Sequence, residues 1–526
     1  MGKVKNINNL EGCVLTIILL LITIVLFVFN EVRFFSLGTD SAGYVDLIRI
    51  VAENGTLSSS IFSSFYSIMP LLGVPSDQYC SSPLLSAHRA SSFLQWHPYL
   101  LSYILAFPVK YFSVAPLDIA ALSNAINVTA SIALIYWYLK KKGLMTWEAL
   151  SFIFAITISD YWVGAIVGQF YFDRLFMLPG LILVLFCYEQ REGNYYTWLS
   201  ISFAALLSAI LISERTAVLA GVVTFGYWFL LREYRFKNQN ITLLVFSVIS
   251  LIYFILFLKF FQNSVYYDRL DWPNIFHNLS ISLIPSGSLF KSTMLWFGIV
   301  SPMVILAFVN WRYGLLVVGA LLPNLLMSVG GAEKTGFATH YHAGYIPFLV
   351  GFAAVGYATL INKARQYSFV TTDWFNKKVL VVMIPLAVIF SCVGVSNFKE
   401  SLQAYIRIPG AMTAMDSTVT TKQDFLYFVK NIPANEWISS PEWTMPSLFA
   451  LGKTNLDYMP IGLGTNRYVI VNYSLQSNLP IIPSYLDSLA KDKISTCMQD
   501  KLDSDYKIKS EKVISGMRYV IYEKLP

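Results

Sequence analysis

Charged and aromatic side chains that could carry out a group transfer gather in the segments between long apolar runs. In chain order they are Asp40, Tyr44, Asp46, His88, Arg89, His97, Asp160, Asp173, Arg174, Glu214, Arg215, Glu333, Lys334, His340 and His342. A carboxylate beside a membrane surface can act as a general base toward an acceptor hydroxyl or amine. Arginine, lysine or a divalent cation can stabilise the phosphate of a departing lipid carrier. These residue types are therefore compatible with transfer from a lipid-linked phosphate.

Each of these residues also has an ordinary structural explanation. Glu214 and Arg215 are adjacent in SERTA, which is equally compatible with a local ion pair at a helix junction. Asp160 fits a solvated turn. Asp46 falls one and a half turns after Asp40 on an amphipathic helix, where we expect it to face solvent. Carboxylates and histidines also bind metals, but no local spacing here requires a metal.

The composition is that of a membrane protein. Of 526 residues, 56% are hydrophobic and 13% are charged, against about 25% charged residues in soluble domains. Repeated apolar runs of roughly 18 or more residues predict transmembrane helices. The net charge of +7 lies almost wholly before residue 397, because residues 397–526 hold 14 Lys and Arg against 13 Asp and Glu. The positive-inside rule explains this excess, so membrane lipids are expected as surroundings and nucleic acid is not expected as a partner.

Positive charges set the expected orientation of the spans. Lys3 and Lys5 place the N-terminus in the cytoplasm, and the cluster Lys140 to Lys142 marks the next cytoplasmic end. Two apolar stretches, 98–114 and 117–139, lie between these clusters. If both crossed the membrane, the three lysines would face outward. We therefore expect 98–114 to lie in or re-enter the interface and only 117–139 to cross.

The same alternation predicts about eleven transmembrane helices, a long first outer loop at 31–116 and a C-terminal domain on the outer side of the cell (inner or plasma) membrane. The spans are expected at about 12–30, 117–139, 146–163, 174–189, 196–212, 216–231, 241–261, 292–310, 313–330, 342–361 and 379–396. The expected organisation is a helical polytopic membrane domain over 1–396 and a polar domain over 397–526. In the polar domain, short strands are predicted for four segments, WISS, RYVIVNY, YKIKSEKV and MRYVIYEK. Helical patterns occupy about 416–431 and 484–502. This pattern predicts a small α/β domain.

The five cysteines show no spacing typical of a metal site. Cys80 and Cys497 both fall on the predicted outer side. Whether they form a disulfide is left open by the sequence.

Three motifs carry a resemblance to a known family. The first motif follows the first span and reads GTDSAGYVDLIRIVAENGTL. The second ends the same loop and reads WHPYLLSYILAFPVKYFS. The third enters a late span and reads HYHAGYIPFL. They are similar to the first-loop Asp, the His-Pro-rich juxtamembrane helix and the late outer loop of the GT-C superfamily of membrane glycosyltransferases. The resemblance implies a multi-pass fold with an outer C-terminal domain. It also implies a polyprenyl-phosphate-linked sugar as donor, used on the outer side of the membrane in glycan biosynthesis.

The resemblance implies roles for individual residues as well. The catalytic first-loop Asp of the family corresponds to Asp40, as a base or a metal ligand. The second acidic residue of metal-dependent members corresponds to Asp173 or Asp160, with Mg or Mn as the cation. Contacts with the donor phosphate are expected from Arg174, Arg215 and Lys334. The residues expected to line the site are Tyr44, His97, Asp173, Glu214, His340 and His342.

We therefore predict an inverting transferase that moves a sugar from a polyprenyl-phosphate donor to a lipid, glycan or protein acceptor. A surface-polysaccharide polymerase or ligase would share the donor but use a different fold. A transporter or flippase of lipid-linked sugars would place ionisable residues within spans and show an inverted repeat, and neither pattern is evident. Ser41 stands where many family members carry a second acidic residue, so a catalytically inactive glycolipid-binding relative is a further alternative.

Overall fold

The computed structural model of the chain contains two compact units, each built from distant parts of the sequence. Unit 1 comprises Met1–Phe27, Gln95–Leu101 and Leu122–Ile408, and unit 2 comprises Val28–Leu94, Ser102–Ala121 and Pro409–Pro526. The residues that the structure describes are 9–34, 39–59, 61–62, 91–92, 97–167, 170–188, 194–231, 237–260, 273, 276–277, 280, 290–326, 342–366, 374–395, 423–441, 444–453, 455–476, 479–481, 488–514 and 516–526.

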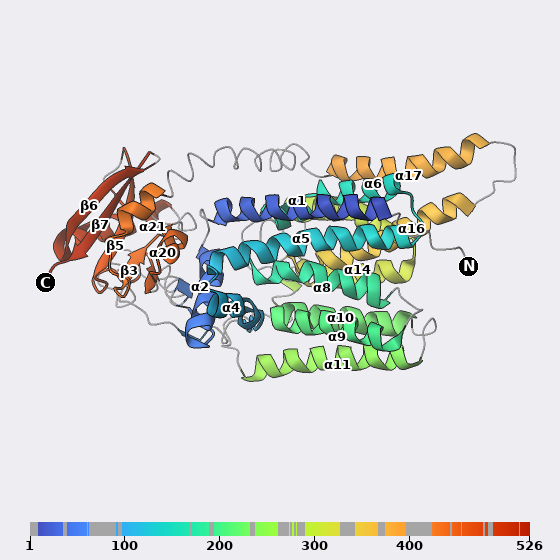
Figure 1. Cartoon of the computed structure of the whole chain (residues 1–526), viewed down its shortest axis with the longest axis horizontal. Helices are drawn as coiled ribbons and strands as arrows, with labels where there is room; N and C mark the ends of the chain where they lie inside the picture. Colours follow the sequence, from blue (N-terminus) through green and yellow to red (C-terminus); the bar gives the residue numbers. More distant parts are fainter. Residues whose placement is uncertain are drawn as a thin grey trace. The chain divides into compact units, whose positions relative to one another are not determined.

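Unit 1 is a helical bundle whose long members run roughly parallel (Figure 1). Its helices are α1 (Asn9–Phe34), α5 (Pro116–Lys141), α6 (Thr146–Thr157), α7 (Asp160–Val167), α8 (Met177–Ile182), α9 (Tyr195–Ile212), α10 (Glu214–Leu231), α11 (Lys237–Phe260), α13 (Phe290–Ala307), α14 (Trp311–Leu326), α16 (Ile346–Gln366) and α17 (Trp374–Val395). The short helices η4 (Phe172–Phe176) and η5 (Leu183–Tyr188) flank α8. Helices α1 and α5 contribute residues to both units.

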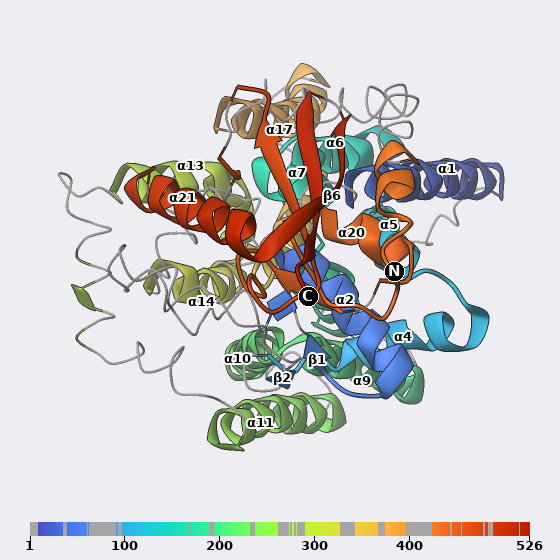
Figure 2. The same ribbon diagram turned by 90° about the vertical axis from the view of Figure 1, so that its left-hand side faces the viewer.

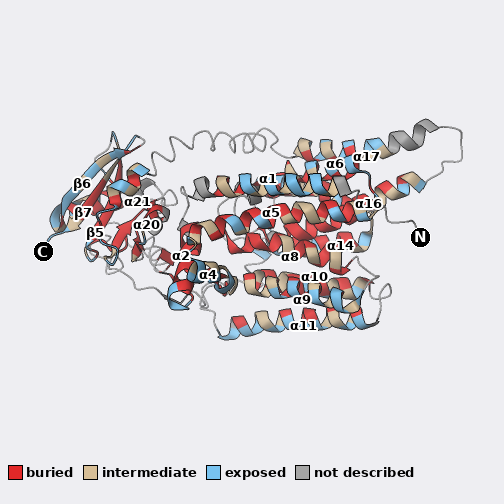
Figure 3. Ribbon diagram, in the orientation of Figure 1, coloured by how far each residue is buried: buried red, intermediate tan, exposed pale blue. Residues whose placement is uncertain are grey.

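Several helices of the bundle are built to face lipid. Within the described residues, five helices are long and apolar enough to cross a membrane, in α1, α5, α9, α11 and α16. In α16, 78% of the span is buried, whereas in α1 only 11% is buried although the span is strongly apolar (Figure 3). Apolar side chains exposed over a whole helix face indicate contact with lipid. The predicted fold class, helical and membrane-spanning with a small C-terminal sheet, is confirmed, while the number of spans stays a prediction.

Two predicted apolar segments have a more specific form in the structure. The segment 98–114 contains α4 (Leu101–Phe112), whose 12 residues extend about 18 Å at 1.5 Å per residue. That is too short for a hydrocarbon core of about 30 Å, as expected for an interfacial segment. The span predicted at 146–163 is divided into two helices in the structure, because α6 ends at Thr157 and α7 begins at Asp160. The carbonyl of Ser159 accepts the first hydrogen bonds of α7, from Trp162 and Val163, so a new helix starts there.

Unit 2 contains a five-stranded sheet in the order β4-β3-β5-β7-β6. The strands are β3 (Ile438–Ser440), β4 (Leu456–Tyr458), β5 (Tyr468–Ser474), β6 (Tyr506–Ile514) and β7 (Met517–Lys524). Strand β3 is parallel to β4 and β5, and β7 is antiparallel to β5 and β6. Helix α20 (Met445–Ala450) joins β3 to β4, and α21 (Ser488–Asp505) lies beside the strands (Figure 2). All four predicted strands are confirmed, and β4 (Leu456–Tyr458) is a further strand that was not predicted.

The core of unit 2 also includes the first-loop helix α2 (Thr39–Asn54). Ala42 of α2 and Ile61 are fully buried in the hydrophobic cluster that contains Leu448 of α20 and the inner residues of the sheet. Gly43 allows this close packing, because a methyl group added to it would lie 2.5 Å from the ring of Phe62. The first-loop helix and the C-terminal sheet are therefore parts of one folded unit.

The cysteines differ in oxidation state. Cys497, in α21, takes part in a disulfide. Cys13, Cys187 and Cys392 are free thiols. Cys80 lies outside the described residues, so the structure does not test whether it pairs with Cys497.

A buried carboxylate in β4 should make unit 2 sensitive to pH. The side chain of Asp457 is fully buried, and its Oδ2 accepts a hydrogen bond of 2.9 Å from Asn466. Burial raises the pKa of Asp457 to about 7, although the bond from Asn466 acts in the opposite direction. Because the folded unit then binds this proton more tightly than the unfolded chain, the free energy of unfolding should fall as the pH rises from about 4 to about 7.

Asp457→Asn should remove this decrease in the free energy of unfolding at high pH. The amide keeps an oxygen that can accept from Asn466 and carries no charge, so at pH 8 we expect unit 2 to be stabilised by about 2–4 kcal/mol, as for a pKa shift of about three units. Thermal unfolding of the full chain at pH 5 and pH 8 would measure this. Glu511→Gln, the same change of charge on an exposed residue of β6, should have no comparable effect. Equal responses of the two variants would contradict the prediction.

Candidate functional site

A buried group of ionisable side chains lies where α9 ends and α10 begins. Nδ1 of His97 lies 2.6 Å from Oε1 of Glu214, and Nη2 of Arg215 lies 3.3 Å from Nε2 of the same histidine. The carboxylate of Glu214 is fully buried, and Arg215 is 29% exposed. Nε of Arg215 is 3.8 Å from Glu214, so this carboxylate lies closer to His97 than to the adjacent arginine. Because an arginine side chain can only donate, these distances fit a His97 that accepts from Arg215 at Nε2 and donates to Glu214 from Nδ1.

The second buried carboxylate, Asp173, is bound to the same two segments. Its Oδ1 accepts a hydrogen bond of 2.6 Å from Ser213, the residue before Glu214, and its Oδ2 accepts one of 3.2 Å from Tyr99. Its side chain is almost completely buried. His97 and Tyr99 therefore each bind one of the two acidic residues. Neither Ser213 nor Tyr99 was identified from the sequence, although both lie within two residues of a predicted site residue.

The sequence SERT explains why the chain turns at this point. Ser213 has an extended backbone, with φ −165° and ψ 164°, and ends α9. Its hydroxyl accepts a hydrogen bond of 3.3 Å from the N–H of Thr216, as an N-cap residue does. Glu214 is then the first residue of α10, where the positive end of the helix dipole favours a carboxylate. Ser213 thus both caps α10 and makes Glu214 the first residue of that helix.

Arg174 is held in place from α5. Its carbonyl accepts a hydrogen bond of 2.9 Å from the side chain of Asn127, whose Oδ1 accepts the N–H of Leu178 at 3.1 Å. One amide therefore binds both sides of the junction between η4 and α8. The guanidinium of Arg174 lies 5.2 Å from the centre of the Tyr171 ring, a cation–π contact.

His342 belongs to a neighbouring chain of hydrogen bonds. Its Nδ1 lies 2.8 Å from the hydroxyl of Tyr345, which accepts a hydrogen bond of 2.9 Å from Nε1 of Trp296. The segment 342–347 packs against α10, which begins with Glu214 and Arg215, and against α8, which follows the short helix η4 that contains Arg174. A methyl group on Gly344 would lie 3.1 Å from Leu219 of α10, and one on Gly180 of α8 would lie 2.5 Å from Pro347. His342 thus belongs to a segment that packs against α8 and α10.

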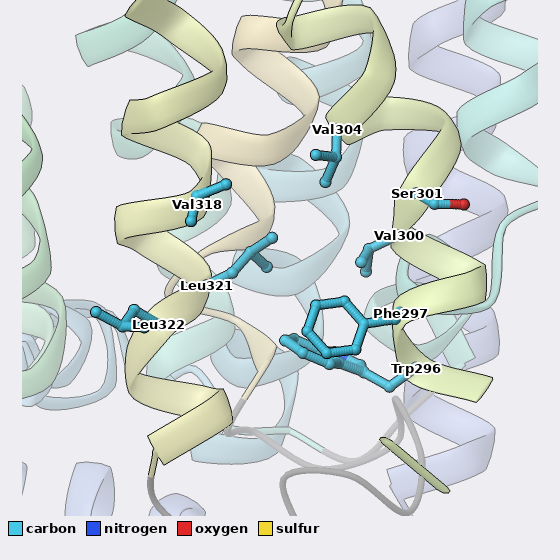
Figure 4. A pocket seen from close by; sticks show the side chains of 8 residues that line it. All are labelled: Trp296, Phe297, Val300, Ser301, Val304, Val318, Leu321 and Leu322. Carbon is cyan, nitrogen blue, oxygen red and sulfur yellow. The ribbon is translucent and has the colours of Figure 1, made fainter. Parts of the chain in front are cut away.

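An apolar cavity of about 170 Å³ lies between α13 and α14 (Figure 4). Its lining residues are Trp296, Phe297, Val300, Ser301, Val304, Val318, Leu321 and Leu322. Trp296 forms part of the wall and also donates to Tyr345. The cavity is therefore adjacent to the hydrogen bonds that end at His342.

The predicted site residues fall in three groups. Those that the structure places in unit 1 are His97, Asp173, Arg174, Glu214, Arg215 and His342. Lys334 and His340 lie outside the described residues. Asp40 and Tyr44 belong to α2 in unit 2. The roles given to all of these residues stay predictions.

Helix α2 places Asp40 in its first turn, and the side chain of Asp40 lies outside the described residues. Tyr44 is buried against Phe62, with ring centroids 5.1 Å apart. The expectation that Asp46 faces solvent is wrong: it is 0% exposed and forms an ion pair with Arg49 at 2.7 Å. Burial raises the pKa of Asp46, against the opposite influence of Arg49. The polar face of the helix is covered by other residues of unit 2, which periodicity alone could not reveal.

The described residues fit a divalent cation poorly. Within the described ranges, no three His, Cys, Asp or Glu side chains come together in a way that could hold a metal ion. Both oxygens of Asp173 accept hydrogen bonds from hydroxyl groups. Asp173 as a metal ligand would have to exchange these partners, so we derive no step that uses a metal. A ligand role for Asp40 stays a prediction.

The architecture defines a class of fold: a multi-pass helical membrane protein with a small sheet domain near the C-terminus. Within that class, the crystal structure of ArnT from Cupriavidus metallidurans in the apo state is similar to this chain, with a TM-score of 0.50, 13% identity, and coverage of 97% of this chain and 98% of ArnT. A crystal structure of ArnT from the same organism bound to undecaprenyl phosphate gives a TM-score of 0.47, 12% identity, and coverage of 96% and 97%. No protein-family model and no curated protein matches the sequence. The similarity to apo ArnT confirms the fold that the GT-C resemblance implied.

Proposed function

We propose that this protein is a membrane glycosyltransferase that moves a sugar from a polyprenyl-phosphate donor to a lipid, glycan or protein acceptor on the outer side of the cell membrane. The observation that carries the proposal is the buried group His97, Glu214 and Arg215 beside Asp173, in a fold shared with ArnT over nearly the whole chain. Ionisable residues at membrane depth are costly and mark functional sites. Here they occur at helix ends, where a lipid phosphate would be held.

The proposed reaction is a single displacement at the anomeric carbon of the sugar. Asp40 accepts the proton of the acceptor hydroxyl or amine as the new bond to the sugar forms. The bond between the sugar and the phosphate oxygen breaks, and the polyprenyl phosphate leaves with the electron pair. Arg215, held by His97 and partly exposed, stabilises the charge that develops on the phosphate, together with Arg174. Attack opposite the leaving group inverts the configuration of the sugar.

Turnover by the purified protein tests this function. The protein in lipid nanodiscs is incubated with radiolabelled polyprenyl-phosphate sugars and with candidate acceptors. A transferase releases free polyprenyl phosphate and adds one sugar to the acceptor. A flippase would move the donor between the leaflets of a vesicle without consuming it, and a polymerase would yield products with many sugar units. Either of these results would replace the proposed function.

The apolar cavity between α13 and α14 supports a lipid-linked donor. We propose that it holds a short stretch of the isoprenoid chain. It is lined by apolar side chains of the membrane-spanning unit, and Trp296 connects it through Tyr345 to His342. A chain seated here would bring its phosphate end toward the polar helix ends described above.

Val318→Trp should fill this cavity and weaken only long-chain donors. Val318 lines the cavity and is 42% exposed, so the larger ring has room to turn without disturbing the buried core. We expect KM to rise about tenfold for a long-chain donor, equivalent to about 1.4 kcal/mol, and to stay unchanged for a donor with two isoprene units. Leu315→Trp, on the same helix but outside the cavity lining, is the matched control. A rise in KM that does not depend on chain length would contradict the assignment.

A further inference from the structure

A second buried group of charges lies on α2, apart from the unit 1 site. Oδ1 of Asp46 accepts two hydrogen bonds from Arg49, of 2.7 Å from Nη2 and 3.2 Å from Nε. Oδ2 accepts a third, of 2.6 Å, from the hydroxyl of Ser59. Asp46 and Ser59 are buried, and Arg49 is 7% exposed. Both carboxylate oxygens are thus bound inside unit 2.

The network joins α2 to the segment that follows it. The hydroxyl of Ser59 also accepts the N–H of Phe62 at 3.3 Å, so Asp46 is linked to the backbone of that segment. One turn earlier, the ring of Phe62 fills the space left by Gly43. Helix α2 is therefore held at two levels, by packing at Gly43 and by hydrogen bonds at Asp46.

Stability alone does not account for charges at this position. Replacing a buried ion pair by apolar side chains of similar volume is often neutral or stabilising, by about 1–4 kcal/mol. The neighbouring residues Val45, Leu47 and Ile48 are buried and apolar, so an apolar side chain would suit the surroundings of Asp46. Apolar contacts permit a helix to slide or rotate, whereas the directional hydrogen bond from Ser59, which lies outside α2, holds the Asp46 carboxylate in one place while Arg49 of the same helix orients it. This points to a requirement for accurate placing of α2.

We propose that Asp46 and Ser59 are positioning residues that set the rotation and height of α2 and thereby place Asp40, and that Arg49, one turn along the same helix, orients the Asp46 carboxylate for its bond to Ser59. Asp40 precedes Asp46 by six residues on the same helix, about 9 Å along its axis. A rotation of α2 would move the Asp40 carboxylate through a wide arc. The inference rests on the proposed function, since it takes Asp40 to be the general base.

Ser59→Ala and Asp46→Asn test the inference in the full-length protein. Ser59→Ala removes one hydrogen bond, and Asp46→Asn removes the charge while keeping the shape. We expect kcat to fall about 10- to 100-fold and KM for the donor to stay within about twofold, as for a misplaced catalytic group. Ser59→Thr, which keeps the hydroxyl, should restore kcat. Glu53→Gln is the control, because Glu53 is 45% exposed and its amide can still accept from Arg49.

Amide hydrogen exchange over residues 40–48 supplies a readout that does not need activity. Faster exchange there in Ser59→Ala and Asp46→Asn, with exchange in β5 and β7 unchanged, supports a positioning role. Unchanged kcat and unchanged exchange in both variants would overturn it. Faster exchange throughout unit 2, with a general loss of stability, would also overturn it in favour of a purely structural role. If Asp40→Asn stays fully active, the proposed role of Asp40 fails separately, and the exchange data still decide whether the network holds α2.

Discussion

Asp40→Asn should lower the rate of sugar transfer by about 10²- to 10⁴-fold, the contribution typical of a positioned general base. The amide has nearly the same shape as the carboxylate but cannot take the proton of the acceptor at neutral pH. Donor binding should change little, because the donor phosphate is expected to contact Arg174 and Arg215. Turnover assays and calorimetric titration with the polyprenyl-phosphate donor would separate the two effects. Loss of kcat with unchanged donor affinity is the expected result.

The variant Asp424→Asn is the control for a general effect of removing a carboxylate charge. Asp424→Asn removes one carboxylate from a surface ion pair with Lys512, in which Asp424 is 47% exposed. Transfer by this variant should match that of the unaltered protein. Full activity of Asp40→Asn would show that another group serves as base, and Asp173 would be the next to test.

Glu214→Ala should destabilise the membrane-spanning unit by about 3–5 kcal/mol, because removal of one partner leaves the rest of a buried charged group unsatisfied. Glu214 is fully buried and accepts from His97, which in turn accepts from Arg215. Without the carboxylate, His97 loses the partner that sets its tautomer and Arg215 loses its neighbouring negative charge. We expect transfer to be lost as well, since Arg215 would no longer be held. Unfolding in detergent and turnover in nanodiscs would measure the two effects.

A double-mutant cycle with His97→Ala isolates the interaction itself. The two single changes should be strongly non-additive, with a coupling free energy of about 1–3 kcal/mol, as for residues in direct contact. Glu436→Ala is the comparison, because Glu436 pairs with an arginine that is 55% exposed and such pairs contribute about 0–1 kcal/mol. Additive effects of Glu214→Ala and His97→Ala would contradict the network described here.

Much of the architecture could be predicted because it depends on local pattern. Long apolar runs predict spans, and alternating segments such as RYVIVNY and MRYVIYEK predict strands that the structure contains as β5 and β7. The short segment 98–114 was expected not to cross, from charge parity, and α4 is too short to do so. The break between α6 and α7 was missed, because residues 158–159 are too few to interrupt an apolar window.

The site could be predicted in its residue types but not in its connections. His97, Asp173 and Glu214 stood out as ionisable residues between apolar runs, and the structure brings all three together. Ser213 and Tyr99 complete the network, yet hydroxyl groups are common near helix ends and carry no signal by themselves. The environment of Asp46 was wrongly expected to be solvent, because amphipathic periodicity identifies one buried face and says nothing of what covers the other.

The sequence by itself determined that this is a multi-pass helical membrane protein with a small C-terminal α/β part, because hydrophobic periodicity and charge act over neighbouring residues. Only the tertiary structure showed that His97 binds Glu214 across 117 residues and that Ser213 binds Asp173 across 40. It alone joined α2, at the start of the chain, to the core of the C-terminal sheet. Contacts between distant segments depend on how complete faces pack, and no local pattern of residues records which faces will meet.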